Sequence, residues 1–105
     1  MRKPTKGVPM STTVIIHIFA KTGQRDAVLE QHHLLIQRHG DDPKLLRMDC
    51  YFPEDEPEQI VEIATWESKE AHQQWRQRVI DSGDADAYIS LLAKPSSLLY
   101  LSPAK

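Results

Sequence analysis

The segment from Ile60 to Arg78 changes its hydrophobic period once, and this change constrains the fold more than any other feature of the chain. Its first half alternates from residue to residue, which is the period of a half-buried strand. From Ser68 onward, Ala71, Trp75 and Val79 recur every four residues and therefore share one face of a helix. The Ser68 hydroxyl can cap that helix by accepting a backbone N–H of its first turn. A strand is thus predicted to run into a helix with almost no loop.

The rest of the chain supplies further strands and helices on both sides of this joint. The predicted elements are a strand at 12–20, a helix at 25–39, a strand at 45–52, a strand at 60–66, a helix from residue 68 interrupted at 81–83, a short helix within 84–94 and a strand at 97–101. This βαββαβ order predicts an α+β, ferredoxin-like antiparallel sheet with the helices on one face.

The chain has 105 residues, a length that suits one domain. We expect this domain to span residues 12–105 and residues 1–11 to form a disordered N-terminal tail, with Met10 as an alternative start of the native protein. The net charge of −2 arises from interspersed acids and bases, which argues against nucleic acid and anionic membranes as partners.

Two further features bear on where the chain works. No segment approaches the roughly 18 consecutive apolar residues that a membrane-spanning helix needs. The single cysteine, Cys50, cannot form a disulfide within the chain, which fits a reducing compartment. We therefore expect a cytoplasmic protein without a membrane partner.

The first predicted strand is apolar on both faces. Val14, Ile16 and Ile18 alternate with Ile15 and Phe19, so neither side of the strand is suited to water. Helices on one face of the sheet leave the other face bare, and an exposed apolar sheet of this size invites aggregation. We expect the bare face to pack against a second copy of the chain in a homodimer.

This order of elements, together with the segments TVIIHIFAKTGQ (13–24) and IVEIATWESKEAHQQW (60–75), resembles the antibiotic biosynthesis monooxygenase family of dimeric α+β barrels. The resemblance covers about residues 12 to 102. It implies a cavity between sheet and helices that takes polycyclic phenols, quinols, other small metabolites or haem. Some members of the family oxygenate phenols with no metal or flavin, because the substrate itself reduces O₂.

The chain departs from the family pattern at several positions. Quinol-oxidising members carry histidine where this chain has Trp75. A tryptophan there resembles the haem-degrading branch, but the proximal histidine of that branch has no counterpart between Arg76 and Lys94, where Asp84 stands at the corresponding place. The asparagine on the first strand of that branch is also replaced, by Ile16. These departures disfavour haem degradation.

Two histidines are the candidate catalytic residues. His17 lies in the first strand and His72 near the start of the second long helix. An imidazole can take the proton of a phenol near neutral pH. The alternatives are that His17 faces the dimer interior, held by one hydrogen bond, and that His72 is a surface residue.

Five residues are candidates for binding the ligand. Trp66 and Trp75 can form an aromatic wall on which a flat ring stacks, or they can be ordinary core residues. His32 lies on the apolar stripe of the first helix, so it can contact a ligand or be a hydrogen-bonded core histidine. Tyr51 and Tyr88 can donate hydroxyl hydrogen bonds, or they can be half-buried amphipathic residues.

Metal and thiol chemistry find no support in the sequence pattern. Adjacent His32 and His33 point about 100 degrees apart on a helix, so they cannot share one ion without help. Cys50 has no base near it in the sequence, so a nucleophilic role is not supported. We assign no metal and no cofactor.

The leading hypothesis is a small cytoplasmic homodimer that acts as a cofactor-independent monooxygenase on a small aromatic, phenolic or quinol-like metabolite. The competing hypothesis is a non-catalytic module of the same fold that binds a small molecule or another protein. Haem binding is the third and least favoured hypothesis.

Overall fold

The structure of the chain is a computed structural model that describes residues 11–104. Its elements are β1 (Thr12–Phe19), α1 (Arg25–His39), β2 (Leu45–Tyr51), β3 (Gln59–Trp66), α2 (Lys69–Ser82), α3 (Asp86–Ser90) and β4 (Ser97–Leu101). The predicted tail lies outside the described residues except for its last residue, Ser11. None of the described helices combines the length and the apolar character needed to cross a bilayer.

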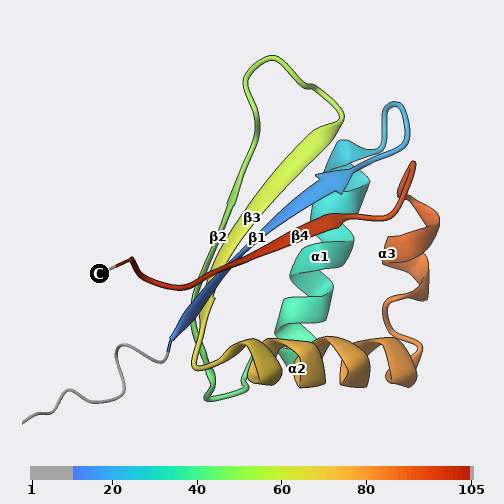
Figure 1. The fold of residues 1–105 in the computed structure, drawn as a ribbon. Coiled ribbons are helices and arrows are strands. Elements are labelled where there is room, and N and C mark those ends of the chain that lie inside the picture. Colours follow the sequence, from blue (N-terminus) through green and yellow to red (C-terminus); the bar gives the residue numbers. More distant parts are fainter. Residues whose placement is uncertain (1–10, 105) are drawn as a thin grey trace, which may run out of the picture.

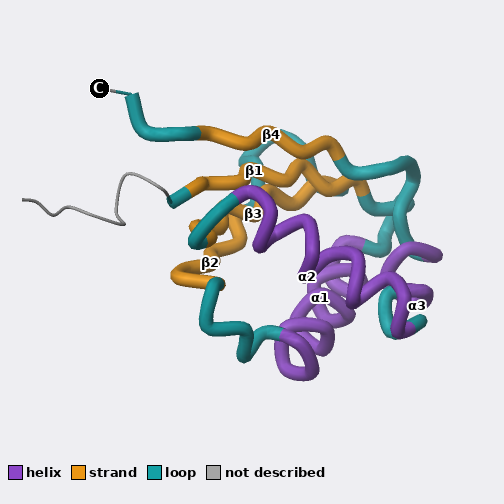
Figure 2. The backbone as a smooth tube through the Cα atoms, turned by 60° about the horizontal axis from the view of Figure 1, so that its bottom comes forward, coloured by secondary structure: helices purple, strands orange, loops and turns teal. Residues whose placement is uncertain are grey.

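The four strands form one antiparallel sheet in the order β2-β3-β1-β4. All three helices lie on one side of this sheet (Figure 1). Seen from a second direction, they gather into a layer beside the strands (Figure 2). The predicted α+β, ferredoxin-like fold is therefore confirmed, with the second helical region divided into α2 and α3.

The side of the sheet that faces the helices holds the core. Val14 and Ile18 of β1 are buried there, and so are their cross-strand partners Ala64 and Ile60 of β3. Glu62 lies between those two partners and therefore projects to the same side, where it is buried as well. A carboxylate in this position requires a partner, and this requirement shapes the site described below.

The joint between β3 and α2 follows the predicted pattern. Ser68 has an extended backbone, and its Oγ accepts a hydrogen bond of 3.1 Å from the backbone N–H of Ala71. Helix α2 ends at Gly83, whose φ of 81° lies in the left-handed region that glycine adopts without strain. The predicted cap and the predicted helix end are both present.

Helices α1 and α2 are tied together at their crossing. The indole N–H of Trp75 donates to the carbonyl oxygen of His39 at 2.6 Å, and this carbonyl lies in the last turn of α1. The His39 ring in turn bonds Asp84 at 2.8 Å, just beyond α2. These contacts fix the orientation of the Trp75 ring and the distance between the two helices.

The opposite side of the sheet carries apolar residues that no described helix covers. Ile15, Ile63 and Leu99 are aligned across β1, β3 and β4 on this side. Leu99 exposes 56% of its surface. This bare apolar face is the surface that the expected homodimer would bury.

The cap of α2 yields the first testable prediction. Replacing Ser68→Ala removes the side-chain hydrogen bond that caps the first turn of the helix, and such losses cost about 1 kcal/mol of stability. Urea unfolding measures the free energy of unfolding of this variant. The control is Ser102→Ala, at an exposed serine after β4, which should unfold like the wild type. Equal stability of the two variants would show that the Ser68 cap contributes nothing.

Candidate functional site

A cavity of about 410 Å³ lies between the sheet and the helices. This volume falls within the roughly 300 to 1,000 Å³ that is typical of small-molecule sites. Much of its wall is apolar, with contributions from Leu35 of α1, Val79 of α2 and Leu98 of β4. The polar side chains in its wall are few, and each has a specific environment.

The two tryptophans occupy different environments. Trp75 lines the cavity, where its ring is held by the bond to His39. Trp66 is only 1% exposed and packs behind Trp75, with ring centroids 5.4 Å apart. The structure therefore places Trp75 at the cavity and Trp66 in the core, so only Trp75 is available to stack on a ligand.

His72 lines the cavity as a buried histidine, 2% exposed, and not as a surface residue. Its Nδ1 shares a hydrogen bond of 2.8 Å with the hydroxyl of Tyr100. Burial, as the largest cause, lowers the pKa of His72 from its ordinary value. The imidazole is therefore neutral at pH 7, and its Nε2 has no hydrogen-bond partner among residues 11–104. When Nδ1 carries the proton and donates it to Tyr100, Nε2 is left as a base.

His32 provides the partner that the buried Glu62 requires. Its Nε2 lies 2.5 Å from Glu62 Oε1, and its Nδ1 lies 3.9 Å from Cys50 Sγ. Burial acts to lower the pKa of His32, but hydrogen bonding to Cys50 and Glu62 outweighs burial and raises it to about 10. His32 is therefore an imidazolium at neutral pH and donates to the Glu62 carboxylate. Both residues line the cavity as a neutral ion pair.

Sequence reasoning missed the connection to Cys50. Cys50 and Glu62 are cross-strand neighbours on β2 and β3, and His32 reaches them from α1, so no short-range motif contains all three. Within the described part of the chain, this cluster brings three candidate metal-ligand atoms within 4.8 Å of one another. The imidazole stands between the thiol and the carboxylate, however, with one nitrogen turned to each. The arrangement is that of a hydrogen-bonded relay.

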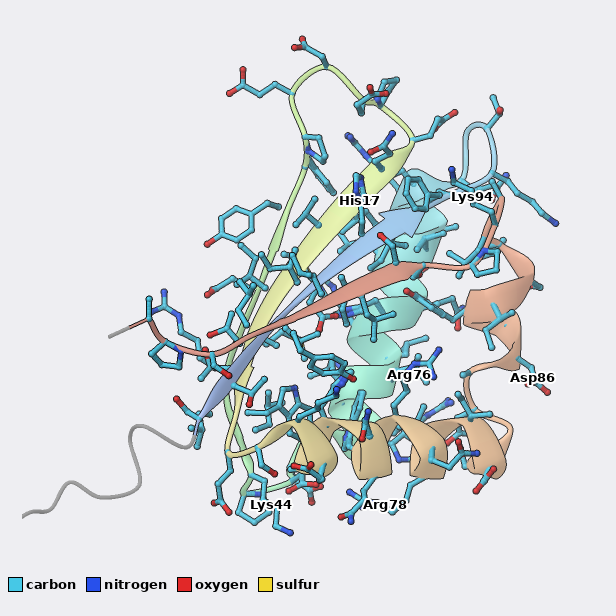
Figure 3. All side chains as sticks on the ribbon, viewed as in Figure 1. His17, Lys44, Arg76, Arg78, Asp86 and Lys94 are labelled. Atoms are coloured by element: carbon cyan, nitrogen blue, oxygen red, sulfur yellow. The ribbon has the colours of Figure 1, made fainter. Side chains whose placement is uncertain are left out.

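Arg76 lines the cavity and is exposed to solvent. It lies one helical turn after His72, and Ile80 one turn further also lines the cavity, so these three residues share a face of α2. Lys94, in the loop before β4, lines the cavity as well. Figure 3 shows Arg76 extending from α2 toward β4, and Lys94 at the end of the cavity away from α2.

Tyr88 contributes a phenol hydroxyl group to the cavity. It projects from α3 into the wall of the cavity, with its ring centroid 6.4 Å from that of His32. Burial raises the pKa of Tyr88 above its usual value. It is therefore a neutral phenol that can donate a hydrogen bond to a ligand.

The structure does not bring His17 and Tyr51 to this cavity. His17 alternates with the buried Ile18 on β1, so it projects to the bare side of the sheet, where it bonds Gln59 and stacks on Phe19 at 4.5 Å. Tyr51 lies on the edge strand β2, opposite Val61, and is exposed. The sequence could not indicate which face of β1 the helices cover, since both faces are apolar.

Comparison with known proteins adds two findings. The model of the family described as antibiotic biosynthesis monooxygenase matches residues 11–79. No curated protein matches the chain.

Solved structures with the same fold cover nearly the whole chain. A protein of Bordetella bronchiseptica assigned to the antibiotic biosynthesis monooxygenases is 11% identical, with a TM-score of 0.79 over 91% of this chain and 99% of its own. A protein of Nitrosomonas europaea with the same assignment is 15% identical, with a TM-score of 0.77 over 96% of this chain and 95% of its own. SnoaB of Streptomyces nogalater, described as a cofactor-independent oxygenase, is 15% identical, with a TM-score of 0.74 over 90% of this chain and 94% of its own. At these identities the similarity establishes the fold.

The raised pKa of His32 predicts a specific dependence of stability on pH. The folded chain binds this proton more tightly than the unfolded chain, with a pKa of about 10 against about 6.5. The resulting stabilisation is complete below pH 6.5 and is lost as the pH rises through 10. In urea unfolding experiments, the free energy of unfolding of the wild type should therefore fall as the pH is raised from 6.5 to 10. In His32→Gln this fall should be smaller.

The matched control is His33→Gln, because His33 is the exposed neighbour of His32 on the same helix. This control should keep the wild-type decline. An identical decline in His32→Gln and wild type would refute the charged state assigned to His32.

Proposed function

The chain belongs to the antibiotic biosynthesis monooxygenase family, and from this membership and the cavity we propose that it oxygenates a small phenolic or quinol-like aromatic without a bound cofactor. The observation that carries the proposal is His72, a buried neutral base in the wall of an otherwise largely apolar cavity, beside Trp75. The description of SnoaB as a cofactor-independent oxygenase lends support at the level of the fold.

Substrate binding in this proposal relies on shape and on exclusion of water. A flat ring stacks on Trp75, whose indole cannot turn away because it is bonded to α1. The aliphatic side chains of α1, α2 and β4 surround the rest of the ring. Tyr88 donates a hydrogen bond to a ring oxygen from the opposite helix, α3.

Proton removal starts the chemistry. Nε2 of His72 takes the phenol proton, and the resulting phenolate transfers an electron to O₂ far more readily than the phenol does. Tyr100 remains bonded to Nδ1 and stabilises the imidazolium that forms. Recombination of the two radicals forms a C–O bond and gives a ring peroxide that takes back the phenol proton from His72. Its O–O bond then breaks as the hydrogen of the ring carbon is lost, so one oxygen atom stays on the ring and the other leaves as water. The net reaction of a phenol with O₂ gives a quinone and water.

The competing function is a non-catalytic binding module of the same fold. It is favoured by one observation: of the two histidines predicted to act as bases, only His72 reaches the cavity, while His17 lies on the far side of the sheet. Tight binding of hydroxynaphthalenes without O₂ uptake would decide for this alternative.

The role of His72 gives a kinetic prediction. His72→Ala should slow O₂ uptake with dihydroxynaphthalene by the roughly 10²- to 10⁴-fold that is typical of a lost general base. His17→Ala is the matched control and should retain nearly full activity, because His17 does not line the cavity. The proposal fails if His72→Ala keeps wild-type uptake in an oxygen-electrode assay.

The homodimer is the second part of the proposed function. The resemblance to a family of dimeric barrels supports it, and so does the bare apolar side of the sheet. We expect wild type to elute at twice the mass of the chain at micromolar concentration.

A charge on the bare side should break this dimer. Leu99→Asp removes apolar contact from the proposed interface and introduces two like charges across it, so it should elute as a monomer in size-exclusion chromatography with light scattering. Ile89→Asp, at a residue 50% exposed on α3, is the control and should remain dimeric. A wild-type monomer, or a dimeric Leu99→Asp variant, would overturn this assignment of the interface.

A further inference from the structure

We propose that Arg76 forms an anion subsite at the rim of the cavity, and that the ligand is a hydroxylated aromatic bearing a carboxylate. The inference refines the function proposed above, since it takes the aromatic nature of the ligand from that proposal. It assigns a further contact to the ligand and a chemical class to its substituent.

The rim of the cavity is positively charged although the chain carries a net charge of −2. Glu62 is the carboxylate in the cavity wall, and its charge is already balanced by His32 at 2.5 Å. The charge of Arg76 is therefore left over. Arg76 lines the cavity while it is exposed to solvent, so it presents an unpaired positive charge to an entering ligand, and an anionic group on that ligand would be favoured.

Arg76 differs from the other arginines that the structure describes. Three of them have carboxylate partners: Arg78 with Asp42 at 2.7 Å, Arg47 with Asp49 at 2.8 Å, and Arg38 with Asp84 at 3.8 Å. Arg25 instead lies 3.8 Å above the ring of Phe52. Over residues 11–104, Arg76 makes no ion pair and no cation–π contact, so its guanidinium is available to a ligand.

The position of Arg76 suits a ligand that also reaches the base. Side chains one helical turn apart are about 5 to 6 Å apart at Cβ, so Arg76 and His72 face the same occupant from the same helix. After burial, the positive charge of Arg76 is a further cause that lowers the pKa of His72, which places the guanidinium within electrostatic reach of the base. A carboxylate on Arg76 would orient the phenol of the same molecule toward His72.

A guanidinium group favours a carboxylate in particular. Its planar fork of N–H donors matches the two oxygens of a carboxylate and binds them in parallel. The second cation, Lys94, is turned away from the cavity, because its ammonium lies 4.2 Å above the ring of Phe19 on the bare side of the sheet. A single available guanidinium beside apolar walls fits one carboxylate on an aromatic ring.

The test compares two stable probes that differ only in the carboxylate, hydroxynaphthoate and naphthol. Binding is measured without oxygen by quenching of tryptophan fluorescence, so no turnover is needed. Wild type should bind hydroxynaphthoate about tenfold more tightly than naphthol, the low end of what a hydrogen bond to a charged group contributes. The preference should shrink as salt is added, because the rim is open to solvent.

Matched variants locate the effect. Arg76→Gln should lose the preference for hydroxynaphthoate while naphthol binds as in wild type. Arg78→Gln makes the same charge change two residues away, at an arginine paired with Asp42, and should keep the preference. Lys94→Gln should also keep it, because the Lys94 ammonium lies over the ring of Phe19.

The possible outcomes separate this inference from the proposed function. Equal binding of the two probes by wild type, or equal loss in Arg76→Gln and Arg78→Gln, overturns the anion subsite even if O₂ uptake is found. A preference that depends on Arg76 upholds the subsite even if no phenol supports O₂ uptake, in which case only the proposed oxygenation fails.

Discussion

The site depends on the ion pair between His32 and Glu62. A carboxylate on the buried face of a central strand is costly unless a charged partner bonds it, and α1 supplies this partner. The pair ties the middle of α1 to the middle of β3 and adds no net charge to the cavity. Because Glu62 is neutralised in this way, it cannot also neutralise Arg76. The electrostatic character of the cavity therefore follows from one hydrogen-bonded contact between a helix and the sheet.

Helix α2 is held at its start and at its middle, and its second half lines the cavity. Ser68 fixes its start directly after β3, and Trp75 ties its middle to the last turn of α1. The part of α2 beyond Trp75 faces the cavity through Arg76 and Val79. The same two constraints position a rigid aromatic ring and a buried base on one wall, which is what oxygenation of a phenol without a cofactor would require of the protein.

The order of the elements was predictable from the sequence, because the change of period after Trp66 and the alternation in β1 are local signals. Trp75, His32 and Tyr88 line the cavity, so a role for them in ligand binding stays a prediction. Arg76 was missed because it follows the apolar stripe by one position and is exposed, although it lines the cavity. The relay to Cys50 was missed because its members come from three elements. Such contacts depend on tertiary packing, which a single sequence does not reveal.

The central claim is that the cavity holds one charged and one neutral histidine, His32 and His72. Nitrogen-15 NMR of the ring nitrogens measures both states directly in one sample. At about pH 8, between the ordinary histidine pKa of 6.5 and the value of about 10 for His32, the account predicts an imidazolium at His32 and a singly protonated ring at His72. A neutral His32 or a charged His72 at that pH would contradict it.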